Sequence, residues 1–512
     1  MLVHKAIAKS VPITWLLDQY GPPRCGTFRL RATKRDGGRR GETLRAQVIL
    51  RTSRARTVQS LHCASHKVFM MQNTTHQIVI VGGGAGGLEL ATRLGKAFGR
   101  GTQAHITLVD KNRTHIWKPK LHEIAAGSMD FGDHEVDYMA QAHWNHFTFR
   151  IGELRGLDRQ SKTIELAPYV DSDGLPVTPT QHIAYDTLVV CIGSLSNDFG
   201  TQGVQEFALR LETQHDAKQF HSKMVNACIR AHNQTADIHQ SQLHVAIIGA
   251  GATGVELAAE LHRTTREVVA FGLDRIDADK DIKVSLIEAA DRILPALPPR
   301  LSAATQALIT RLGVQVLTQA KVTEVMPTGV RLADGRVVES ELVVWAAGVK
   351  APDFLKDLGG LETNRINQLV VNDTLQTTRD ADIFALGDCA ACPCGDAAGG
   401  RAGMVPPRAQ AAHQQASHLF LQIKRRFANK PLKPYHYKDF GSLVSLGKFS
   451  TVGNMMGGLI GNNLMIEGYF AKAMYLSLYK LHELAIHGFL KTSLYTLARM
   501  ITKQTNPTVK LH

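Results

Sequence analysis

The chain has 512 residues, 44% of them hydrophobic and 20% charged, which excludes a disordered protein and predicts roughly two to four domains. Its seven cysteines are too scattered for a disulfide framework and favour a reducing compartment. The formal net charge of +14 does not indicate nucleic-acid binding, because residues 1–71 alone carry +11, from 14 Lys and Arg against 3 Asp and Glu, and the other 441 residues only +3.

Residues 1–70 form a basic extension with no sustained helical or strand period. Three interpretations stay open. The extension is an organelle transit segment, which would be Arg-rich and poor in acids; a disordered arm that touches a membrane or nucleic acid; or no part of the mature chain, which would then begin at Met70 or Met71. No run of about 18 apolar residues follows, so we expect no transmembrane helix.

The first strong motif is "HQIVIVGGGAGGLELATRLG", which begins at His76. An apolar strand leads into Gly82, Gly84 and Gly87, spaced as G-x-G-x-x-G, and a helix follows. These glycines would allow the tight turn, the approach of a pyrophosphate and the close packing of helix on strand. The next strand, "HITLVD", ends at Asp110, whose carboxylate could accept the ribose hydroxyls.

The same pattern returns in "HVAIIGAGATGVELAAEL", with Gly249, Gly251 and Gly254, and in "IKVSLIEAADRILP", where a strand ends at Glu288. One such motif is weak evidence, but two copies in the same strand–helix–strand–acid context are specific. The Glu288 carboxylate would bond a free 2′-hydroxyl and repel a 2′-phosphate, which favours NADH over NADPH.

Two dinucleotide folds in one chain suggest a flavoprotein, with FAD on the first fold and a nicotinamide on the second. The stretch "DIFALGDCA" (382–390) would place Asp388 near the flavin ribityl chain. We therefore predict an α/β protein with two Rossmann-like domains. The expected divisions are a first FAD-binding part at 76–195, an NADH-binding domain at 240–350, a second FAD-binding part at 365–440 and a membrane-association region at 441–512.

The C-terminal region carries an apolar helical stripe of Leu490, Leu494, Leu497 and Ile501, at i, i+4, i+7 and i+11. Lysines and arginines flank the stripe and acids are few, as is typical of a helix that lies in a membrane interface. The alternative is a helix packed on the protein's own core or in a dimer.

The segment "CAACPC" contains Cys389, Cys392 and Cys394. A zinc site needs four ligands, and no second cysteine pair lies at a suitable spacing. We interpret these residues as structural or incidental thiols and predict no metal site.

Together, "GGGAGGLELA", "GAGATGVELAAEL", "WAAGV", "IFALGDCA", "PPRAQAAHQQ" and "DFGSLVSLGKFSTVG" resemble the type II NADH dehydrogenases from about residue 76 to the end. These are single-subunit NADH:quinone oxidoreductases that do not pump protons. The resemblance implies the FAD/NAD(P) disulfide-reductase-like fold with a membrane-binding C-terminal helical segment, non-covalent FAD, NADH as donor, and ubiquinone or menaquinone as acceptor.

The resemblance also implies site residues. FAD would lie on Gly82, Gly84, Ala85, Gly86, Gly87, Asp110, Lys111, Asp388, Ala409, Gln410 and Lys448. NADH would lie on Gly249, Gly251, Gly254, Glu288, Ala347 and Gly348. Four residues would serve the reaction itself: Glu256 as a proton relay near the stacked rings, Lys448 as a cation beside the flavin, and Gln410 and Gln414 towards the quinone. The alternatives are a helix residue that holds a loop for Glu256 and a solvated lysine for Lys448.

Within "PPRAQAAHQQ", Gln410 and Gln414 lie at i, i+4 on one helical face, whereas Gln415 would point elsewhere. Two rival functions remain. One is a sulfide:quinone oxidoreductase of the same fold, which would use Cys191 and Cys389; the other is a non-catalytic FAD- and NADH-binding interaction protein. We expect the cytoplasmic face of a bacterial inner membrane, or the mitochondrial inner membrane if residues 1–70 are a transit segment. No nucleic-acid partner is expected, and a homodimer is left open.

Overall fold

The computed structural model describes residues 75–130, 132, 134–394, 403–446, 451–455, 464–467, 469–502 and 509. Two predictions lie outside these residues: the interpretation of residues 1–70 and the placement of Lys448 beside the flavin. Both stay predictions.

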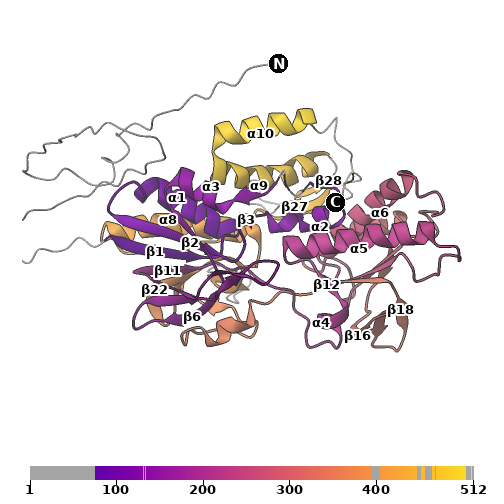
Figure 1. Cartoon of the computed structure of the whole chain (residues 1–512), viewed down its shortest axis with the longest axis horizontal. Helices are drawn as coiled ribbons and strands as arrows, with labels where there is room; N and C mark the ends of the chain where they lie inside the picture. Colours follow the sequence, from indigo (N-terminus) through magenta and orange to yellow (C-terminus); the bar gives the residue numbers. More distant parts are fainter. Residues whose placement is uncertain are drawn as a thin grey trace, which may run out of the picture. The chain divides into compact units, whose positions relative to one another are not determined.

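The first sheet has six strands in the order β21-β22-β11-β1-β2-β5 (Figure 1). All pair in parallel except β21, which is antiparallel to β22. Residues 78–81 of β1 are completely or almost completely buried, as expected for a parallel strand covered on both faces. The strands are β1 (His76–Val81), β2 (Ala104–Asp110), β5 (Thr148–Ile151), β11 (Thr187–Val190), β21 (Gln376–Thr377) and β22 (Asp380–Ala385).

Two long helices, α1 (Ala85–Phe98) and α8 (Ala409–Phe427), pack against each other beside this sheet. Helix α1 follows β1 directly, whereas α8 comes from far along the chain. Strand β22 follows the second sheet in sequence but belongs to the first sheet. There its residue Ile383 pairs with Leu188 of β11. The first sheet is therefore built from two separated stretches of sequence.

The second sheet has five parallel strands in the order β12-β19-β13-β14-β15. Its strands are β12 (Leu209–Arg210), β13 (His244–Ile248), β14 (Lys283–Ile287), β15 (Gln315–Leu317) and β19 (Leu342–Trp345). The helices of this part are α5 (Gln214–Asn233), α6 (Ala252–Ala270) and α7 (Pro299–Arg311). Helix α6 follows β13 as α1 follows β1.

A three-stranded antiparallel sheet occupies the same place in each half, just before the strand that pairs with the strand of the glycine motif, β11 with β1 and β19 with β13. The first consists of β6 (Leu154–Asp158), β7 (Thr163–Leu166) and β10 (Gln181–Ala184). The second consists of β16 (Val322–Met326), β17 (Gly329–Leu332) and β18 (Val337–Glu339). The chain thus uses one structural plan twice, which confirms the predicted α/β class with two Rossmann-like halves.

The shorter elements connect these parts. They are β3 (Thr114–His115), η2 (Lys118–Lys120), α2 (Leu121–Ala125), β4 (Val136–Asp137), α3 (Tyr138–Asn145), β8 (Tyr169–Val170), β9 (Pro176–Thr178), α4 (Val204–Phe207), η3 (Asp353–Asp357), β20 (Leu369–Val370), η4 (Gly387–Cys389), β23 (Ala390–Ala391), β24 (Pro393–Cys394) and β25 (Gly403–Met404).

The C-terminal part contains the antiparallel sheet β26 (Ser442–Ser445), β27 (Thr451–Met455) and β28 (Leu464–Glu467), followed by α9 (Tyr469–His487) and α10 (Phe489–Thr502) (Figure 1). Helix α9 contacts all three strands and also α10. Gly488, at φ +78°, lets the chain turn between the two helices. In the described part of the chain, no helix has both the length and the apolar character needed to cross a membrane.

Candidate functional site

The first glycine turn leaves no room for side chains at two of its three positions. Gly82 has φ +103°, and a Cβ atom there would lie 2.4 Å from the Cys191 carbonyl oxygen. A Cβ on Gly87 would lie 1.8 Å from the Gly82 carbonyl oxygen. Around Gly84, in contrast, a Cβ would meet nothing within 4 Å. The turn is therefore tight towards the protein and open at Gly84, which fits the approach of a pyrophosphate to the N-terminus of α1.

The acid that follows the first turn is already oriented by backbone groups. The Asp110 carboxylate accepts hydrogen bonds from Gly83 N at 2.7 Å and from Asn112 N at 2.8 Å. Burial raises the pKa of this carboxyl group, and the two N–H donors oppose that rise. The neighbouring Lys111 forms an exposed ion pair with Glu153, 3.0 Å away. Asp110 is thus held beside the turn, where it can accept a ribose hydroxyl.

The first turn of α1 is also packed against the returning chain. A Cβ on Gly86 would lie 2.5 Å from Leu386 Cδ1, and the Ala412 carbonyl of α8 is close by. Ala85, the first residue of α1, is half-buried. Gly86 therefore allows the segment after β22 to pass close to the dinucleotide turn.

The second glycine turn repeats the geometry of the first. Gly249 has φ +98°, and a Cβ there would lie 2.8 Å from Ala347 Cα. A Cβ on Gly254 would lie 2.0 Å from the Gly249 carbonyl oxygen, while Gly251 has nothing within 4 Å. The Glu288 carboxylate accepts from Ala250 N at 2.8 Å, as Asp110 does from Gly83 N. Both turns therefore provide the same open position and the same oriented acid.

Beyond this turn, Ala347 and Gly348 follow the end of β19. Gly348 has φ +63°, and a Cβ there would lie 2.5 Å from the ring of Phe199, which is itself mostly exposed. Trp345 Nε1 donates to the Asn197 carbonyl oxygen at 2.9 Å, so the strand end and the 197–199 loop are held together. Ala347 thus borders the second turn and Gly348 follows it, while the contact of both residues with NADH stays a prediction.

Asp388 lies in η4, immediately after the end of β22, and is part of a chain of polar contacts. Ser194 Oγ donates to the Asp388 carboxylate at 2.8 Å, and Lys118 Nζ donates to the Ser194 carbonyl oxygen at 2.7 Å. Burial lowers the pKa of Lys118, while Asp388 opposes this effect. Ser194 ends the apolar stretch "YDTLVVCIGS", and its contact with Asp388 is not evident from the sequence, because 194 positions separate the two residues.

The three glutamine side chains at the start of α8 bond to two different segments of the chain. Gln410 Nε2 donates to Tyr437 Oη at 2.9 Å, and Gln414 exchanges two hydrogen bonds with the Lys438 backbone, at 2.8 and 3.0 Å. Gln415 is the buried one, and its Oε1 accepts from Gly387 N at 2.7 Å, next to Asp388. Gln410 and Gln414 thus face residues 437–439, and Gln415 orients the Asp388 turn. Ala409 is the first residue of this helix.

Glu256 lies in the second turn of α6 and is only 6% exposed. Ser445 N donates to its Oε1 at 3.0 Å, and His122 Nδ1 of α2 lies 3.5 Å from its Oε2. Burial raises the pKa of Glu256 to about 7, against the smaller opposing effects of His122 and the Ser445 N–H. Nothing in the sequence pattern linked His122 to Glu256, since the two lie on different elements far apart in the chain.

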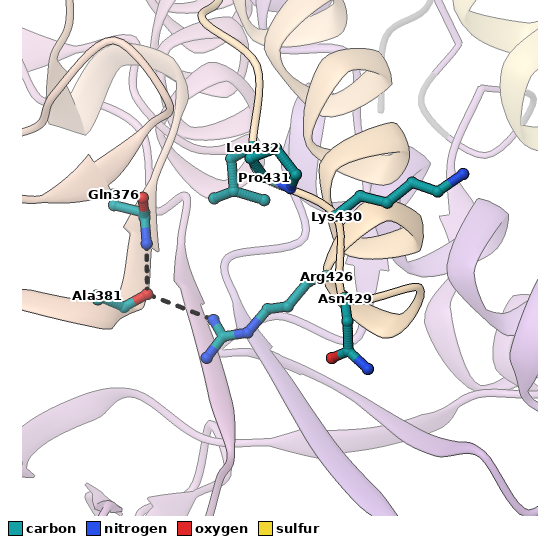
Figure 2. A pocket seen from close by; sticks show the side chains of 7 residues that line it. All are labelled: Gln376, Ala381, Arg426, Asn429, Lys430, Pro431 and Leu432. Carbon is teal, nitrogen blue, oxygen red and sulfur yellow. Dashed lines mark hydrogen bonds between the residues drawn. The ribbon is translucent and has the colours of Figure 1, made fainter.

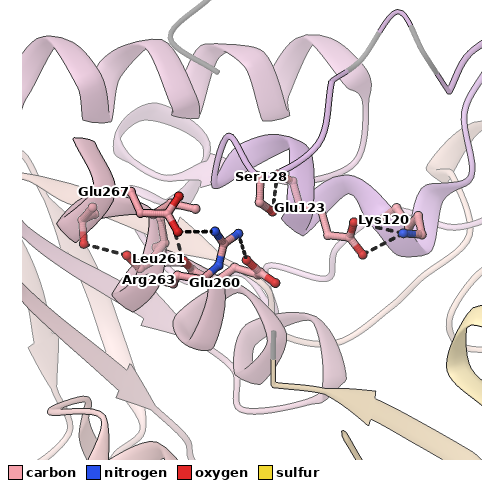
Figure 3. A network of polar contacts seen from close by, with 9 residues as sticks. Lys120, Glu123, Ser128, Glu260, Leu261, Arg263 and Glu267 are labelled. Atoms are coloured by element: carbon pink, nitrogen blue, oxygen red, sulfur yellow. Dashed lines mark hydrogen bonds and ion pairs between the residues drawn. The ribbon is translucent and has the colours of Figure 1, made fainter. Parts of the chain in front are cut away.

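Two further carboxylates, that of Glu123 on α2 and that of Glu260, four residues after Glu256 on α6, pair with a lysine and an arginine (Figure 3). Lys120 Nζ contacts both oxygens of Glu123 at 2.9 and 3.0 Å, and Arg263 Nη2 contacts Glu260 at 2.8 Å. Burial acts to raise the pKa of Glu123, but Lys120 outweighs it and the pKa is lowered. In contrast, the nearest basic side chain to Glu256 among the recorded ion pairs is a histidine. Glu256 is thus a buried carboxyl group whose raised pKa allows proton exchange near neutral pH.

A surface pocket of about 400 Å³ lies elsewhere, between the end of α8 and the β21–β22 edge (Figure 2). Gln376 Nε2 and Arg426 Nη1 both donate to the Ala381 carbonyl oxygen there, at 2.8 and 3.3 Å. None of the predicted site residues lines it. We therefore place the functional site at the two glycine turns and the Glu256 cluster.

Cys191, Cys389 and Cys392 are buried, and their thiols act as hydrogen-bond donors. Cys191 Sγ donates to the Val81 and Gly82 carbonyl oxygens, and Cys389 Sγ donates to those of Val190 and Leu386. Burial raises the pKa of Cys389 to about 12, and that of Cys392 likewise. Within the described residues, no three His, Cys, Asp or Glu side chains are grouped closely enough to hold a metal ion.

Comparison with known proteins gives three findings. Residues 76–416 match the model of the pyridine nucleotide-disulphide oxidoreductase family. The chain is 42% identical over 447 residues to the type II NADH:quinone oxidoreductase of Haemophilus influenzae, a match that covers 85% of this chain and 99% of that protein. Among solved structures, NDH2 from Plasmodium falciparum in complex with NADH has a TM-score of 0.72 at 18% identity and covers 85% of this chain and 100% of that one.

A further solved structure bears on the rival function. The sulfide:quinone oxidoreductase of Aquifex aeolicus has a TM-score of 0.61 at 17% identity and covers 85% of this chain and 96% of that one. At such identities a structural likeness shows the fold alone. The predicted disulfide-reductase-like fold is thereby confirmed.

The glycine geometry predicts a large loss of stability for one substitution in the second turn and almost none for another. Gly254→Ala should lower the stability of the cofactor-free chain by a few kcal/mol (about 2–4), because its Cβ would overlap the Gly249 carbonyl oxygen. Gly251→Ala, at φ −72° and in open space, should stay within about 1 kcal/mol of wild type. Thermal unfolding of the two variants tests this, and equal midpoints would contradict it.

The buried Glu256 predicts a stability that falls as pH rises. Its pKa is about 7 in the folded chain against an ordinary 4.5, so folding favours the protonated form. The contribution of Glu256 to stability is then fully present below about pH 4.5 and is lost as pH rises through about 7, by roughly 3 kcal/mol. In Glu256→Gln this loss should be absent.

Thermal midpoints between about pH 5 and pH 8 provide the measurement. The wild type should lose stability relative to Glu256→Gln over this range. Glu206→Gln, at an exposed position, is the control and should follow the wild type. Parallel curves for wild type and Glu256→Gln would mean that the carboxyl group is not perturbed as described.

Proposed function

Because the chain belongs to the pyridine nucleotide-disulphide oxidoreductase family and, within it, to the type II NADH:quinone oxidoreductases, we propose that it transfers two electrons from NADH through non-covalent FAD to a quinone, without pumping protons. The observation that carries the proposal is the pair of matching glycine turns, each with an open middle glycine and an oriented carboxylate. Two dinucleotides can be held in one chain in this way.

Each half of the chain would bind one of the two dinucleotides. In our proposal, residues 76–195 and 365–440 form the FAD-binding domain, in which Asp110 bonds the ribose and Asp388 closes the site. Residues 240–350 form the NADH-binding domain, where Glu288 bonds the adenosine ribose and disfavours a 2′-phosphate. When bound, the flavin supplies the hydride acceptance and electron transfer that protein side chains lack.

Side chains of the protein would then supply the proton uptake that accompanies quinone reduction. Reduction of a quinone to a quinol takes up two protons, whereas the hydride of NADH accounts for one, so the second comes from solvent. Glu256, whose pKa is about 7, is protonated in about half of the molecules at neutral pH. We assign it the role of proton relay, with His122 as its partner at 3.5 Å. The segment between Lys118 and His122 would connect this relay to the Asp388 contacts.

The quinone side is assigned to the residues around α8. Gln410, Gln414 and Lys448 remain our candidates there, as the resemblance implies. The hydrogen bonds of Gln410 and Gln414 to residues 437–439 would hold that segment in place beside the proposed quinone site. The quinone itself, ubiquinone or menaquinone, is left open, as is a homodimer.

The rival sulfide oxidation is supported less well. Such chemistry needs cysteine thiolates beside the flavin, since the thiolate is the nucleophilic form. Here the thiols of Cys191 and Cys389 donate hydrogen bonds to backbone carbonyls, and burial raises the pKa of both. A purely non-catalytic role would give no function to the buried carboxyl group of Glu256 and its raised pKa.

Membrane association is proposed for α10. Its apolar side chains are exposed: Phe489, Leu490, Leu494, Leu497, Met500 and Ile501 range from 57% to 78%. An apolar helical face of this kind, with Lys491 beside it, suits the boundary between lipid headgroups and acyl chains. We place the protein at the cytoplasmic face of a bacterial inner membrane, as a peripheral protein, with the mitochondrial inner membrane as the alternative.

The electron route is tested by mixing the FAD-loaded protein with NADH in the absence of oxygen and then adding a short-chain quinone. NADH should bleach the flavin absorbance, and the quinone should restore it with one quinone consumed per NADH. In Glu288→Ala, the affinity for NADH should fall by about tenfold while the FAD content is unchanged, because one charge-assisted hydrogen bond is lost. Reduction of the flavin by sulfide but not by NADH would support the rival function.

The membrane proposal is tested by co-sedimentation with vesicles of mixed neutral and anionic phospholipids. Leu494→Ser should weaken binding by about tenfold, because burial of one leucine contributes on the order of 1.5 kcal/mol. Leu421→Ser is the matched control: it is 55% exposed on α8, against 59% for Leu494 on α10, and should bind as the wild type does. Equal losses in both variants would remove α10 as the contact.

A further inference from the structure

A pair of buried histidines joins the C-terminal helix α9 to the first glycine turn. His115 Nε2 and His482 Nε2 are 2.9 Å apart, although the residues are separated by 367 positions in sequence. Each side chain is 4% exposed. The other ring nitrogen of His115, Nδ1, lies 2.9 Å from the Gly83 carbonyl oxygen. A continuous hydrogen-bonded path therefore runs from α9 to the backbone of the turn.

The chemistry of the partners assigns the protons in this path. A carbonyl oxygen only accepts, so His115 Nδ1 must carry a proton and donate to Gly83. A neutral His115 then has a lone pair on Nε2, and His482 must donate to it from its own Nε2. The remaining nitrogen, His482 Nδ1, has no hydrogen-bond partner among the described residues, which agrees with an unprotonated nitrogen. The path works with both rings neutral.

The surroundings keep the rings neutral and oriented. Burial lowers the pKa of His115 to about 4 and lowers the pKa of His482 as well, with His115, His413 and His487 adding to the second effect. The Trp117 ring lies 4.2 Å from that of His482, centroid to centroid. His413, in turn, has the Glu89 carboxylate as its partner, at 2.5 Å.

The target of the path is Gly83, whose N–H and carbonyl groups lie in the two peptides that flank it and are both held by hydrogen bonds. Gly83 N donates to Asp110, and its carbonyl oxygen accepts both His115 Nδ1 and Tyr138 Oη, the latter at 2.8 Å. The carbonyl belongs to the peptide between Gly83 and Gly84, the open position where the pyrophosphate would approach. Rotation of this peptide would displace the Gly84 N–H at the start of α1.

We propose that His482 is a positioning residue for the first dinucleotide: through His115 it orients the Gly83 peptide, so that the seating of α9 determines how tightly FAD is held. This inference rests on the proposed function, which places FAD at that turn. It connects the part of the chain that carries the exposed helix α10 with retention of the cofactor. Loss of the α9 contact would then release FAD while the turn itself stays folded.

The test is the rate of FAD release from the FAD-loaded full-length protein, followed by the rise of flavin fluorescence after dilution. In His482→Leu the donor is removed, and release should be about tenfold faster. In His482→Gln an amide can donate from nearly the same place, and release should return to within about twofold of wild type. Should the leucine variant fail to fold, His482→Asn replaces it, since its amide is too short to reach His115.

Tyr479→Phe is the matched control. Tyr479 lies one turn earlier on α9, is also buried, and bonds to His134 instead, at 3.0 Å. Its release rate should equal that of the wild type. The inference is overturned if His482→Leu (or His482→Asn) keeps FAD as the wild type does, or if His482→Gln releases it as fast as the leucine variant. A wild-type chain that binds no FAD would instead overturn the proposed function itself, and the inference with it.

Discussion

Each dinucleotide turn is governed by one close approach, between the carbonyl oxygen of its first glycine and the helix that follows. The position of a Cβ on Gly87 is 1.8 Å from the Gly82 oxygen, and on Gly254 it is 2.0 Å from the Gly249 oxygen. Because no side chain fits there, strand and helix meet almost directly. The helix N-terminus is then aimed at the open glycine, and the backbone N–H after the first glycine is aimed at the acid of the next strand. The rest of the site is arranged around these two contacts.

A second constraint is electrostatic. The region between α2 and α6 buries three carboxylates close to one another, and such an arrangement is unfavourable unless each has a partner. Glu123 pairs with a lysine and Glu260 with an arginine. Glu256 has a histidine at 3.5 Å, and burial raises its pKa to about 7. The same burial that weakens the fold at high pH gives the proposed reaction a proton donor.

The sequence was sufficient for features whose geometry is local. The turns, their acids and the helices after them follow from residues within about 30 positions of one another, and the structure has them at the expected places. The carboxylate of Glu256 was also recognised, through its resemblance. Side-chain contacts between separate elements could not be predicted from the sequence. They are those of His122 with Glu256, Ser194 with Asp388 and His482 with His115. Gln415 points away from Gln410 and Gln414, as expected, but its partner Gly387 is not evident from the sequence. Such contacts depend on how separate elements pack, which no local pattern encodes.

The return of β22 to the first sheet has a consequence for the order in which the chain is made. Leu188 of β11 pairs with Ile383 of β22, and the whole second sheet lies between them in sequence. During synthesis, β11 therefore remains an open sheet edge until the ribosome has passed β22, while the second half can close on its own strands earlier. Parallel pairing over such a distance forms slowly, and an unpaired apolar edge is a site of aggregation. The nascent protein is thus most vulnerable in its first half, although that half is synthesised first.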